Sequence, residues 1–337
     1  GPYGLGATQV TLNVSDGQAS DSCTATVTVV DTTDPIMVGG GDQTIEATSP
    51  AGAIATFSVT ASDNLDGDLV VTCSTASGST FPLGATAVTC TAEDASGNSA
   101  STSFTITVVD TTPPDLVIPA DQLLEAASAA GTATTFSVTA TDIVDTDPTI
   151  ICSDASGDTF GLGTTVVSCT AEDDYNNVSS GSFEIVVQDT IAPALVIPAD
   201  QLLEAASAAG TATTFSVTAT DAVDADPTIV CSAASGDTFA IGSTTVNCTA
   251  EDDYNNVSSG SFTIAVQDTI APALVIPADQ LLEAASAAGT ATTFSVTATD
   301  AVDADPTIVC SAASGDTFSI GSTTVNCTAE DDYNNVS

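Results

Sequence analysis

Hydrophobic and polar residues alternate along short runs of this chain. In residues 215–220 (FSVTAT), Phe215, Val217 and Ala219 occupy one face, and Ser or Thr fills the positions between them. The same period of two continues in residues 227–232, 245–250 and 261–267. Alternation of this kind is typical of strands with one buried face, and turns rich in Gly and Asp separate the runs. Short strands at such intervals predict an all-β fold of the β-sandwich type.

One segment has the composition of a helix but lies among these strands. Residues 201–210 read QLLEAASAAG, and Leu, Glu, Ala and Gln favour helices. The same letters recur at 122–131 and 280–289, and a relative at 43–52 contains Pro50, which would interrupt a helix interior. A helix of this length is also marginal alone. We therefore predict one shared conformation, an edge strand, in which tertiary context overrides helix propensity.

The chain of 337 residues repeats with a period of 79, and residues 190–258 differ from 269–337 only at Ala240 against Ser319. We predict the end of a truncated repeat at 1–30, repeat 1 at 31–109, repeat 2 at 110–188, repeat 3 at 189–267, and repeat 4 at 268–337 without its last strand. Each repeat opens on Asp, with Pro shortly after, which suits a stiff hinge. Copies this similar do one job several times over.

Cysteines come in pairs that keep the same step, and strand parity puts both members of a pair on the inward face. The predicted disulfides are Cys73–Cys90, Cys152–Cys169, Cys231–Cys248 and Cys310–Cys327. Closing a loop of this size contributes about 3 kcal/mol, which matters because the core of such a small sandwich is marginal. Free buried cysteines are the alternative. Structural disulfides indicate an extracellular setting. The remaining Cys23 is expected to pair upstream.

The charge of the chain is one-sided. It holds 44 Asp and Glu residues and no Lys, Arg or His, which gives a formal net charge of −44 at pH 7. Catalytic nucleophiles activated by His or Lys, and zinc sites built on His, are excluded. Binding to nucleic acid or to an anionic membrane surface depends on basic side chains, so we expect neither. No apolar run reaches the length of a transmembrane helix, and the patterned apolar residues argue against disorder.

The motifs of the first full repeat are DQTIEATSPAGA, FSVTASDNLDG, VTCSTASGSTFPLGATAVTCTAEDASGN and SFTITVVDTTPP. In these motifs each repeat resembles the HYR (hyalin repeat) module, an immunoglobulin-like extracellular domain, and the resemblance covers nearly the whole chain. It implies tandem immunoglobulin-like β-sandwiches outside the cell or on its surface, associated with adhesion and with stalks of large proteins. It supplies no catalytic residues, so we predict that the chain is not an enzyme. Later repeats replace AEDASGN by AEDDYNN, which suggests a local role for that loop.

Acidic residues recur at fixed positions, and no side chain of opposite charge can pair with them. Carboxylates near domain ends suit Ca²⁺, which takes about six to eight oxygen ligands. In repeat 3 the predicted ligands are Asp221, Asp224, Asp226, Glu251, Asp252 and Asp268. The alternative is a solvated acidic surface that keeps the chain in solution. Paired carboxylates could also serve a glycosidase, but an array of small sandwiches offers no obvious cleft.

Asn-x-Ser/Thr motifs offer candidate sites for N-linked sugar, although a chain rich in Ser and Thr forms such motifs by chance. They lie at Asn13, Asn177, Asn247, Asn256, Asn326 and Asn335. Strand parity predicts that Asn247 and Asn326 point outward beside an inward Cys. Asn177, Asn256 and Asn335 fall in a polar turn.

These observations favour one function and leave two alternatives. We predict a non-enzymatic repeat region of a long extracellular fibre, stalk or filament, stapled by disulfides, stiffened by Ca²⁺ and carrying sugar. The expected partners are neighbouring copies or other surface proteins and glycans. The alternatives are an adhesin whose repeats bind a ligand, and a spacer attached to a larger secreted enzyme.

Overall fold

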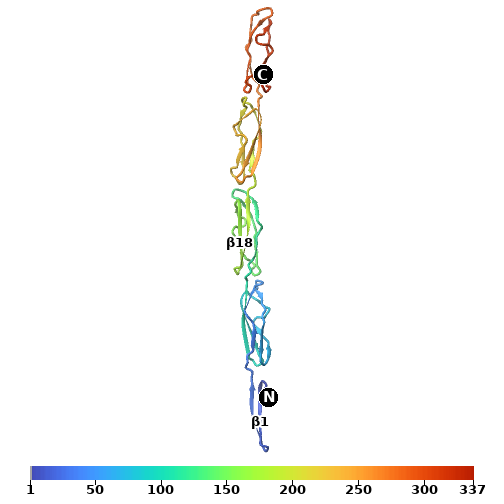
Figure 1. Ribbon diagram of the computed structural model, residues 1–337, viewed down its shortest axis with the longest axis vertical. Helices are drawn as coiled ribbons and strands as arrows, with labels where there is room; N and C mark the ends of the chain where they lie inside the picture. Colours follow the sequence, from blue (N-terminus) through green and yellow to red (C-terminus); the bar gives the residue numbers. More distant parts are fainter. Residues whose placement is uncertain (1) are drawn as a thin grey trace. The chain divides into compact units, whose positions relative to one another are not determined.

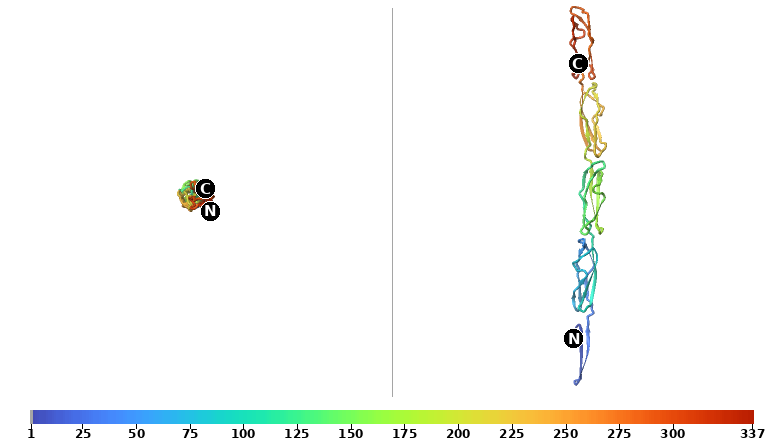
Figure 2. Two further views of the ribbon diagram at one scale, coloured as in Figure 1. Left: turned by 90° about the horizontal axis from the view of Figure 1, so that it is seen from above. Right: turned by 180° about the vertical axis from the view of Figure 1, so that it is seen from behind.

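The computed structural model describes residues 2–337, and all its regular elements are β-strands (Figure 1). The prediction of an all-β fold is therefore confirmed. Within repeats 1 to 3 the strands run lengthwise beside one another, and the turns gather at the two ends of each repeat (Figures 1 and 2). Over residues 2–337 there is no helix with the length and apolar character needed to cross a membrane.

The strands of each repeat follow the same order. Residues before repeat 1 form β1 (Gly6–Ser15) and β2 (Ser20–Val29). Repeat 1 contains β3 (Ile36–Gly39), β4 (Gln43–Glu46), β5 (Ala53–Ile54), β6 (Val59–Asp63), β7 (Gly67–Leu69), β8 (Thr72–Cys73), β9 (Thr80–Phe81), β10 (Gly84–Glu93) and β11 (Ser99–Val109). Repeat 2 contains β12 (Asp115–Val117), β13 (Gln122–Glu125), β14 (Thr132–Ala133), β15 (Thr139–Thr141), β16 (Thr149–Cys152), β17 (Thr159–Phe160), β18 (Gly163–Glu172) and β19 (Val178–Gln188).

Repeats 3 and 4 begin in the same way and end differently. Repeat 3 contains β20 (Ala194–Val196), β21 (Gln201–Glu204), β22 (Thr211–Ala212), β23 (Thr218–Thr220), β24 (Thr228–Cys231), β25 (Thr238–Phe239), β26 (Gly242–Glu251) and β27 (Val257–Gln267). Repeat 4 contains β28 (Ala273–Val275), β29 (Thr290–Ala291), β30 (Thr297–Thr299), β31 (Thr307–Cys310), β32 (Thr317–Phe318) and β33 (Cys327–Glu330).

Repeat 3 shows how the two layers are made. The main sheet has the order β21-β27-β26-β24, in which β21 runs parallel to β27 and the other pairs are antiparallel. The pairs β20-β23 and β22-β25 form the opposite layer. Alternation then buries one face of each strand, as the sequence predicts: Val246, Phe262 and Ile264 are buried on the inner face of the main sheet. Phe262 meets Phe215 edge-on with ring centroids 4.9 Å apart.

The helix-like segment is a strand at the edge of the main sheet in repeat 3. Gln201–Glu204 pair with β27, and the following residues turn back through a bridge between Ser207 and Gly210. Gly210 has a φ of 97°, and a Cβ there would collide with the carbonyl oxygen of Phe239, so the turn requires glycine. The prediction of an edge strand is confirmed here. The prediction of one shared conformation is wrong for repeat 4, where residues 280–283 form no strand.

Candidate metal centre

The first residue of each repeat brings a carboxylate close to two turns of that repeat. In repeat 3 one oxygen from each of Asp189, Asp221 and Asp252 lies within 4.8 Å of the others. Asp189 stands in the linker, Asp221 directly follows β23, and Asp252 directly follows β26. Three acidic side chains from distant parts of the sequence therefore meet at one end of the repeat.

Each turn carboxylate is fixed by backbone N–H groups of its own turn. The Oδ1 of Asp221 accepts hydrogen bonds from the N–H groups of Val223 (2.7 Å) and Asp224 (3.0 Å). The Oδ1 of Asp252 accepts from Tyr254 (2.8 Å) and Asn256 (2.9 Å). Asp commonly bonds to the backbone two residues ahead in this way, so the sequence itself builds both turns.

Asn256 ties the Asp252 turn to the linker. Its Nδ2 donates to Oδ2 of Asp252 at 3.0 Å and to the backbone carbonyl of Asp189 at 3.2 Å. Repeat 1 has the same arrangement with Asn98, Asp94 and Asp31, although Asn98 is followed by Ser-Ala and belongs to no glycosylation motif. The turn asparagine is therefore explained by this linker contact in every repeat.

Asp189 is the member of the cluster without a matching donor. The side chain is buried at 7% exposure, and its Oδ2 has no hydrogen-bond partner. Its Oδ1 accepts only a long bond of 3.2 Å from the N–H of Ile191. Burial, together with the charges of Asp221, Asp252 and Glu125, raises the pKa of Asp189 despite that bond. Burial works against ionisation of Asp252 too, but the hydrogen bonds from Asn256 and Tyr254 outweigh it and lower its pKa.

The same cluster recurs in each of the other repeats. Its members are Asp31, Asp63, Asp66 and Asp94 in repeat 1; Asp110, Asp142 and Asp173 in repeat 2; and Asp268, Asp300 and Asp331 in repeat 4. Asp110 and Asp268 are as buried as Asp189, each has an unpartnered Oδ2, and burial raises the pKa of each. In repeat 1 it is Asp63 that combines burial with an unpartnered Oδ2.

The structure brings together only part of the predicted ligand set. Asp221 and Asp252 meet, but their third partner is Asp189 of the preceding linker, whereas Asp268 joins the cluster of repeat 4. Glu251 is exposed, because it alternates with the buried Ala250 and Asp252 at the end of β26. Asp224 and Asp226 lie outside the cluster, and the Oδ1 of Asp224 accepts the N–H of Asp226 at 2.9 Å. The missed Asp189 carried a signal in the sequence, since every repeat opens on Asp.

The candidate glycosylation sites fall into two groups. Asn13, Asn247 and Asn326 are exposed, and the prediction that Asn247 points outward from β26 agrees with this. The turn residues Asn177, Asn256 and Asn335 are half-buried, and the Nδ2 of each donates two hydrogen bonds. Since Nδ2 is the atom that would carry the sugar, the expected room for a glycan at the turn is absent from these described residues.

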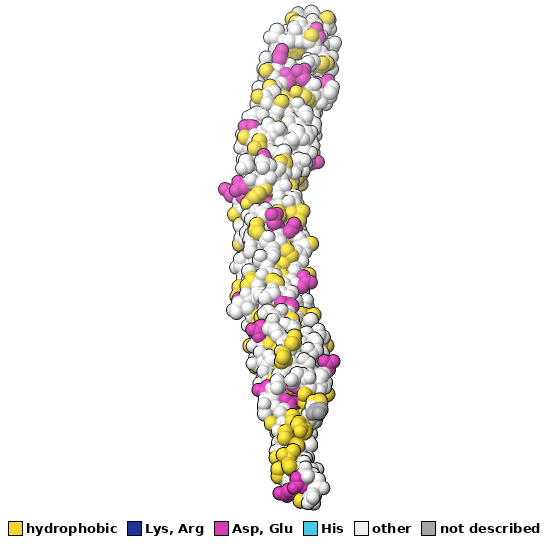
Figure 3. Space-filling view, turned by 60° about the horizontal axis from the view of Figure 1, so that its bottom comes forward, with side chains coloured by type: hydrophobic (Ala, Val, Ile, Leu, Met, Phe, Trp, Pro, Cys, Tyr) yellow, Lys and Arg dark blue, Asp and Glu magenta, His cyan; other side chains and the backbone are white. Residues whose placement is uncertain are grey.

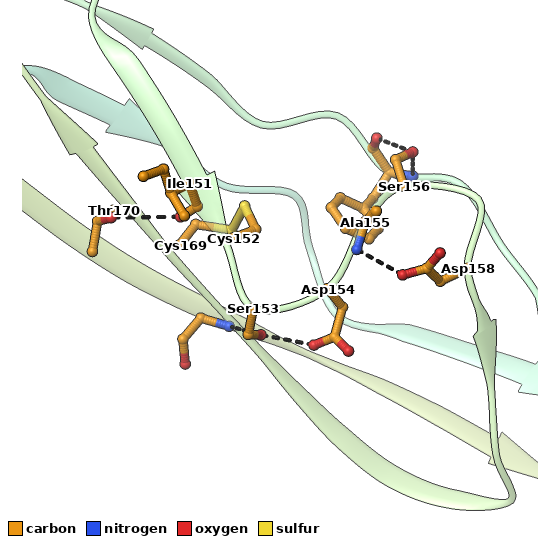
Figure 4. The surroundings of a disulfide bond; sticks show 11 residues. Ile151, Cys152, Ser153, Asp154, Ala155, Ser156, Asp158, Cys169 and Thr170 are labelled. Atoms are coloured by element: carbon orange, nitrogen blue, oxygen red, sulfur yellow. Dashed lines mark hydrogen bonds between the residues drawn. A yellow bond between two sulfur atoms is a disulfide. The ribbon is translucent and has the colours of Figure 1, made fainter.

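One disulfide crosses between neighbouring strands in each repeat. Sulfur–sulfur distances of 2.04–2.08 Å join Cys73–Cys90, Cys152–Cys169, Cys231–Cys248 and Cys310–Cys327. In repeat 2 the bond links β16 to β18, and Oγ of Ser153 next to it accepts the N–H of Ser168 while donating to Asp154 (Figure 4). Cys23 is exposed in β2 and forms no disulfide within residues 2–337.

The surface between these features is acidic and hydroxyl-rich. The face drawn in Figure 3 shows scattered Asp and Glu among hydrophobic side chains and other, uncharged groups. On the outer face of the repeat 3 sheet, Asn247 lies opposite Ser261, Thr245 opposite Thr263, and Thr249 opposite Ser259.

The sequence profile described as "HYR domain" matches residues 30–108, 109–187 and 188–266. The chain belongs to the HYR domain family. Each match begins one residue before the repeat boundary drawn from the sequence and includes all acidic residues of that repeat's cluster. HYR repeats are extracellular modules, so the predicted location outside the cell is supported.

Two curated proteins are similar to this chain along most of its length. The chain is 28% identical to "Hyalin" of Strongylocentrotus purpuratus over 99% of its own length and 30% of the relative's. It is 30% identical to "Hyalin" of Lytechinus variegatus over 93% of its own length and 62% of the relative's. The chain therefore spans less than two thirds of either relative.

Solved structures show weaker similarity. "Protocadherin Gamma B2 extracellular cadherin domains 1-5" is 14% identical, with a TM-score of 0.36 and coverage of 97% of this chain and 78% of that one. "PcdhgB3 EC1-4 in 50 mM HEPES" is 13% identical, with a TM-score of 0.33 and coverage of 78% and 83%. At these TM-scores neither similarity bears on the function.

Proposed function

We propose that this chain is a non-enzymatic structural segment of a long extracellular fibre, stalk or filament, whose HYR repeats bind Ca²⁺ at the Asp clusters. The near-identity of repeats 3 and 4 supports a repeated mechanical role, because nearly identical repeats are expected to perform the same function. A disulfide in each repeat supports durability outside the cell. Both named relatives are hyalins.

The buried oxygen of Asp189 without a donor is the observation that carries the calcium proposal. A desolvated carboxylate is costly unless a cation or a donor compensates it, and the chain has no Lys, Arg or His to do so. Asp221 and Asp252 add two more carboxylates within reach, and both are already oriented by their turns. Protonation, which the raised pKa of Asp189 favours, and a bound metal ion are the two ways left to compensate this charge, and a metal ion is the one that would also offset the charges of Asp221 and Asp252.

The donor set suits a hard cation. All candidate ligand atoms in the clusters are carboxylate oxygens, which Ca²⁺ prefers. In repeat 3 they come from Asp189, Asp221 and Asp252, and water would complete the shell of about six to eight oxygens. A bound Ca²⁺ would supply positive charge where like charges repel, and would hold the linker residue against the two turns. We infer that the linker stiffens as a result.

Calorimetric titration of the whole chain with CaCl₂ tests this function. We expect saturable binding, lost at one cluster when Asp189→Asn removes the linker ligand. Asp226→Asn is the matched control, since it removes an equal charge from an exposed residue outside the cluster. At a Ca²⁺ concentration of about 100 Kd, binding should stabilise the folded state by about 2.7 kcal/mol. Equal behaviour of both variants, or no binding, would refute the proposal.

Scattering and microscopy address the fibre itself. Small-angle scattering with CaCl₂ and with EDTA should give different chain dimensions if the linkers stiffen. Electron microscopy of native particles should show whether neighbouring copies associate into a filament. A single short stalk joined to a catalytic domain would favour the enzyme spacer, and saturable binding of a surface glycan or protein by the repeats would favour the adhesin.

A further inference from the structure

In every full repeat, a glutamate at the end of the parallel edge strand accepts hydrogen bonds from a threonine that follows the last strand. In repeat 3 this residue is Glu204, the final residue of β21, which lies opposite Gln267 at the end of β27. Its Oε1 accepts the N–H of Thr269 at 2.7 Å, and its Oε2 accepts the hydroxyl of Thr269 at 2.7 Å. Hydrogen bonds to a charged acceptor are about twice as strong as neutral ones.

The same geometry occurs in the other two full repeats. Glu125 accepts the N–H and the hydroxyl of Thr190, both at 2.7 Å. Glu46 accepts them from Thr111 at 2.7 and 2.8 Å, and accepts the hydroxyl of Thr112 at 3.0 Å as well. These hydrogen bonds lower the pKa of each glutamate, so all three carry their charge at neutral pH.

Each clamped threonine directly follows the linker aspartate of a cluster. Thr190 follows Asp189, and Asn256 holds the carbonyl of Asp189 from the other side. The linker residue is therefore fixed by Glu125 through its neighbour and by Asn256 directly.

We infer that Glu46, Glu125 and Glu204 are positioning residues for the cation site of the next repeat, each acting through the threonine it holds and not as a ligand. This inference rests on the proposed calcium function. It predicts a coupling between one repeat and the next: loss of a glutamate weakens cation binding at the Asp cluster that begins after it and leaves the other clusters unchanged.

The tyrosines allow each cluster to be measured separately. Tyr254 lies in the turn of Asp252, and Tyr333 lies in the corresponding turn of Asp331. Tb³⁺ replaces Ca²⁺ in oxygen sites and luminesces when a nearby tyrosine is excited. One reporter protein keeps Tyr254 alone and a second keeps Tyr333 alone, with the remaining tyrosines changed to Phe. Displacement of Tb³⁺ by CaCl₂ then gives the affinity for Ca²⁺ at each site.

Glu125→Gln and Glu204→Gln are matched variants with the same change of charge. Substitution of a residue that orients a ligand costs about 10–100-fold in metal affinity. We expect Glu125→Gln to weaken binding at the Tyr254 reporter by about tenfold and to leave the Tyr333 reporter unchanged. Glu204→Gln should do the reverse. Thr190→Ser, which keeps both donors, should bind like the parent, whereas Thr190→Val should weaken the Tyr254 site.

The outcomes separate this inference from the calcium function. If the parent reporters show no saturable Tb³⁺ signal, the calcium function fails and the inference fails with it. If the parents bind but Glu125→Gln changes nothing, the inference alone is overturned. Equal weakening of both reporters by either variant would indicate a general charge effect and would also overturn it. Tm measurements on each variant show whether the repeats are folded, and the Thr190 pair decides the matter if Glu125→Gln unfolds.

Discussion

Repeats 3 and 4 have almost the same sequence but do not have the same structure. Gln201–Glu204 form β21 in repeat 3, whereas the identical residues 280–283 of repeat 4 form no strand. Gly242–Glu251 form β26, but in repeat 4 only Cys327–Glu330 of the matching segment are a strand. Over the residues that the two repeats share, 190–258 and 269–337, the one difference in sequence, Ala240 against Ser319, lies outside both segments.

The difference arises at β27, because residues 269–337 end before most of the segment that would correspond to it. In repeat 3, β27 lies between β21 and β26 and pairs with both. Without such a strand, Leu281 is 101% exposed where Leu202 is 67% exposed. Val325 is half-buried where Val246 is completely buried. The same residues therefore form a strand in one repeat and coil in the other, depending on whether a partner strand such as β27 is present.

The acidic end of the repeat does not depend on that partner. Repeat 4 keeps β31 and β33 joined by Cys310–Cys327, and it keeps the cluster of Asp268, Asp300 and Asp331. Asn335 still donates to Asp331 and to the carbonyl of Asp268. The turns that build the candidate metal centre are therefore local, whereas the main sheet is assembled from distant strands.

The largest expected effect comes from the core residue that β27 supplies. Phe262→Ala should destabilise repeat 3 by about 3–5 kcal/mol, because a buried aromatic that packs against Phe215 is lost. Phe294→Ala, at the position of Phe215 in repeat 4, should cost clearly less, since residues 2–337 contain no matching phenylalanine for it to pack against. Guanidinium unfolding followed by Tyr254 or Tyr333 fluorescence reports the two repeats separately. Equal losses would contradict the role assigned to β27.

The disulfide should produce the next largest effect, and it should matter in both repeats. Replacing Cys231 and Cys248 by Ala should cost about 3 kcal/mol, from the chain entropy of a loop with a sequence separation of 17. Replacing Cys310 and Cys327 should cost about the same, because that bond joins β31 to β33 and closes a loop with the same sequence separation. Unfolding curves of the two double variants test this.

Single replacements test the pairing itself. Cys231→Ala should add one free thiol to that of Cys23, and tagging should find it at Cys248. A tag at Cys327, or no new thiol, would contradict the pairing.

Much of this fold could be predicted from residues that act locally. The period of two gave the buried faces of β26 and β27, and the constant step of the cysteines gave the same pairs that the structure contains. The edge strand at Gln201–Glu204 followed from comparing copies, but its dependence on pairing with β27 did not, because pairing between distant strands leaves no mark in a local pattern.

The residues that meet in the acidic cluster were predicted only in part for a similar reason. Asp221 and Asp252 were found because each follows a strand and begins a turn. Asp268 was chosen for repeat 3 in place of Asp189 because the sequence does not say at which end of a sandwich the two turns lie. The burial of Asp189 could not be predicted either, since it depends on how the linker packs against the turns.

The carboxyl of Asp189 should make stability depend on pH and on cation together. Its pKa is raised above the ordinary 3.8, so the folded state prefers its protonated form. Its contribution is fully present below that ordinary value and is lost as pH rises through the folded pKa. In EDTA at pH 7, Asp189→Asn should therefore raise the Tm of repeat 3 by a few degrees, since about 1 kcal/mol moves Tm by about 4–8 °C in a domain of this size.

The sign of this effect should reverse with the cation. In CaCl₂, Asp189→Asn should lower the Tm, because a ligand is lost. Asp252→Asn serves as the control in EDTA: hydrogen bonds lower the pKa of Asp252, so its ionised form stabilises the fold above 3.8 and the variant should lose stability at pH 7. Thermal unfolding from pH 3 to 7, in EDTA and in CaCl₂, checks the sign of each change in Tm. If both variants shift Tm in the same direction in EDTA, the roles assigned to Asp189 and Asp252 are contradicted.

The smallest effect on stability is expected from sugar on the paired sites Asn247 and Asn326. Asn247 is exposed on β26, opposite Ser261, and Asn326 is exposed at the same position of repeat 4. We predict that both carry glycans in native material with equal occupancy, because both side chains are exposed within the same local sequence. Asn256 should carry none, because its Nδ2 donates two hydrogen bonds.

Cleavage at acidic residues yields peptides that Ala240 and Ser319 distinguish by mass. Removing the glycans should change stability by less than about 0.5 kcal/mol, as for other surface changes, and should instead expose sheet edges to association. Unmodified Asn247 and Asn326 would leave the acidic surface alone to keep the chains apart.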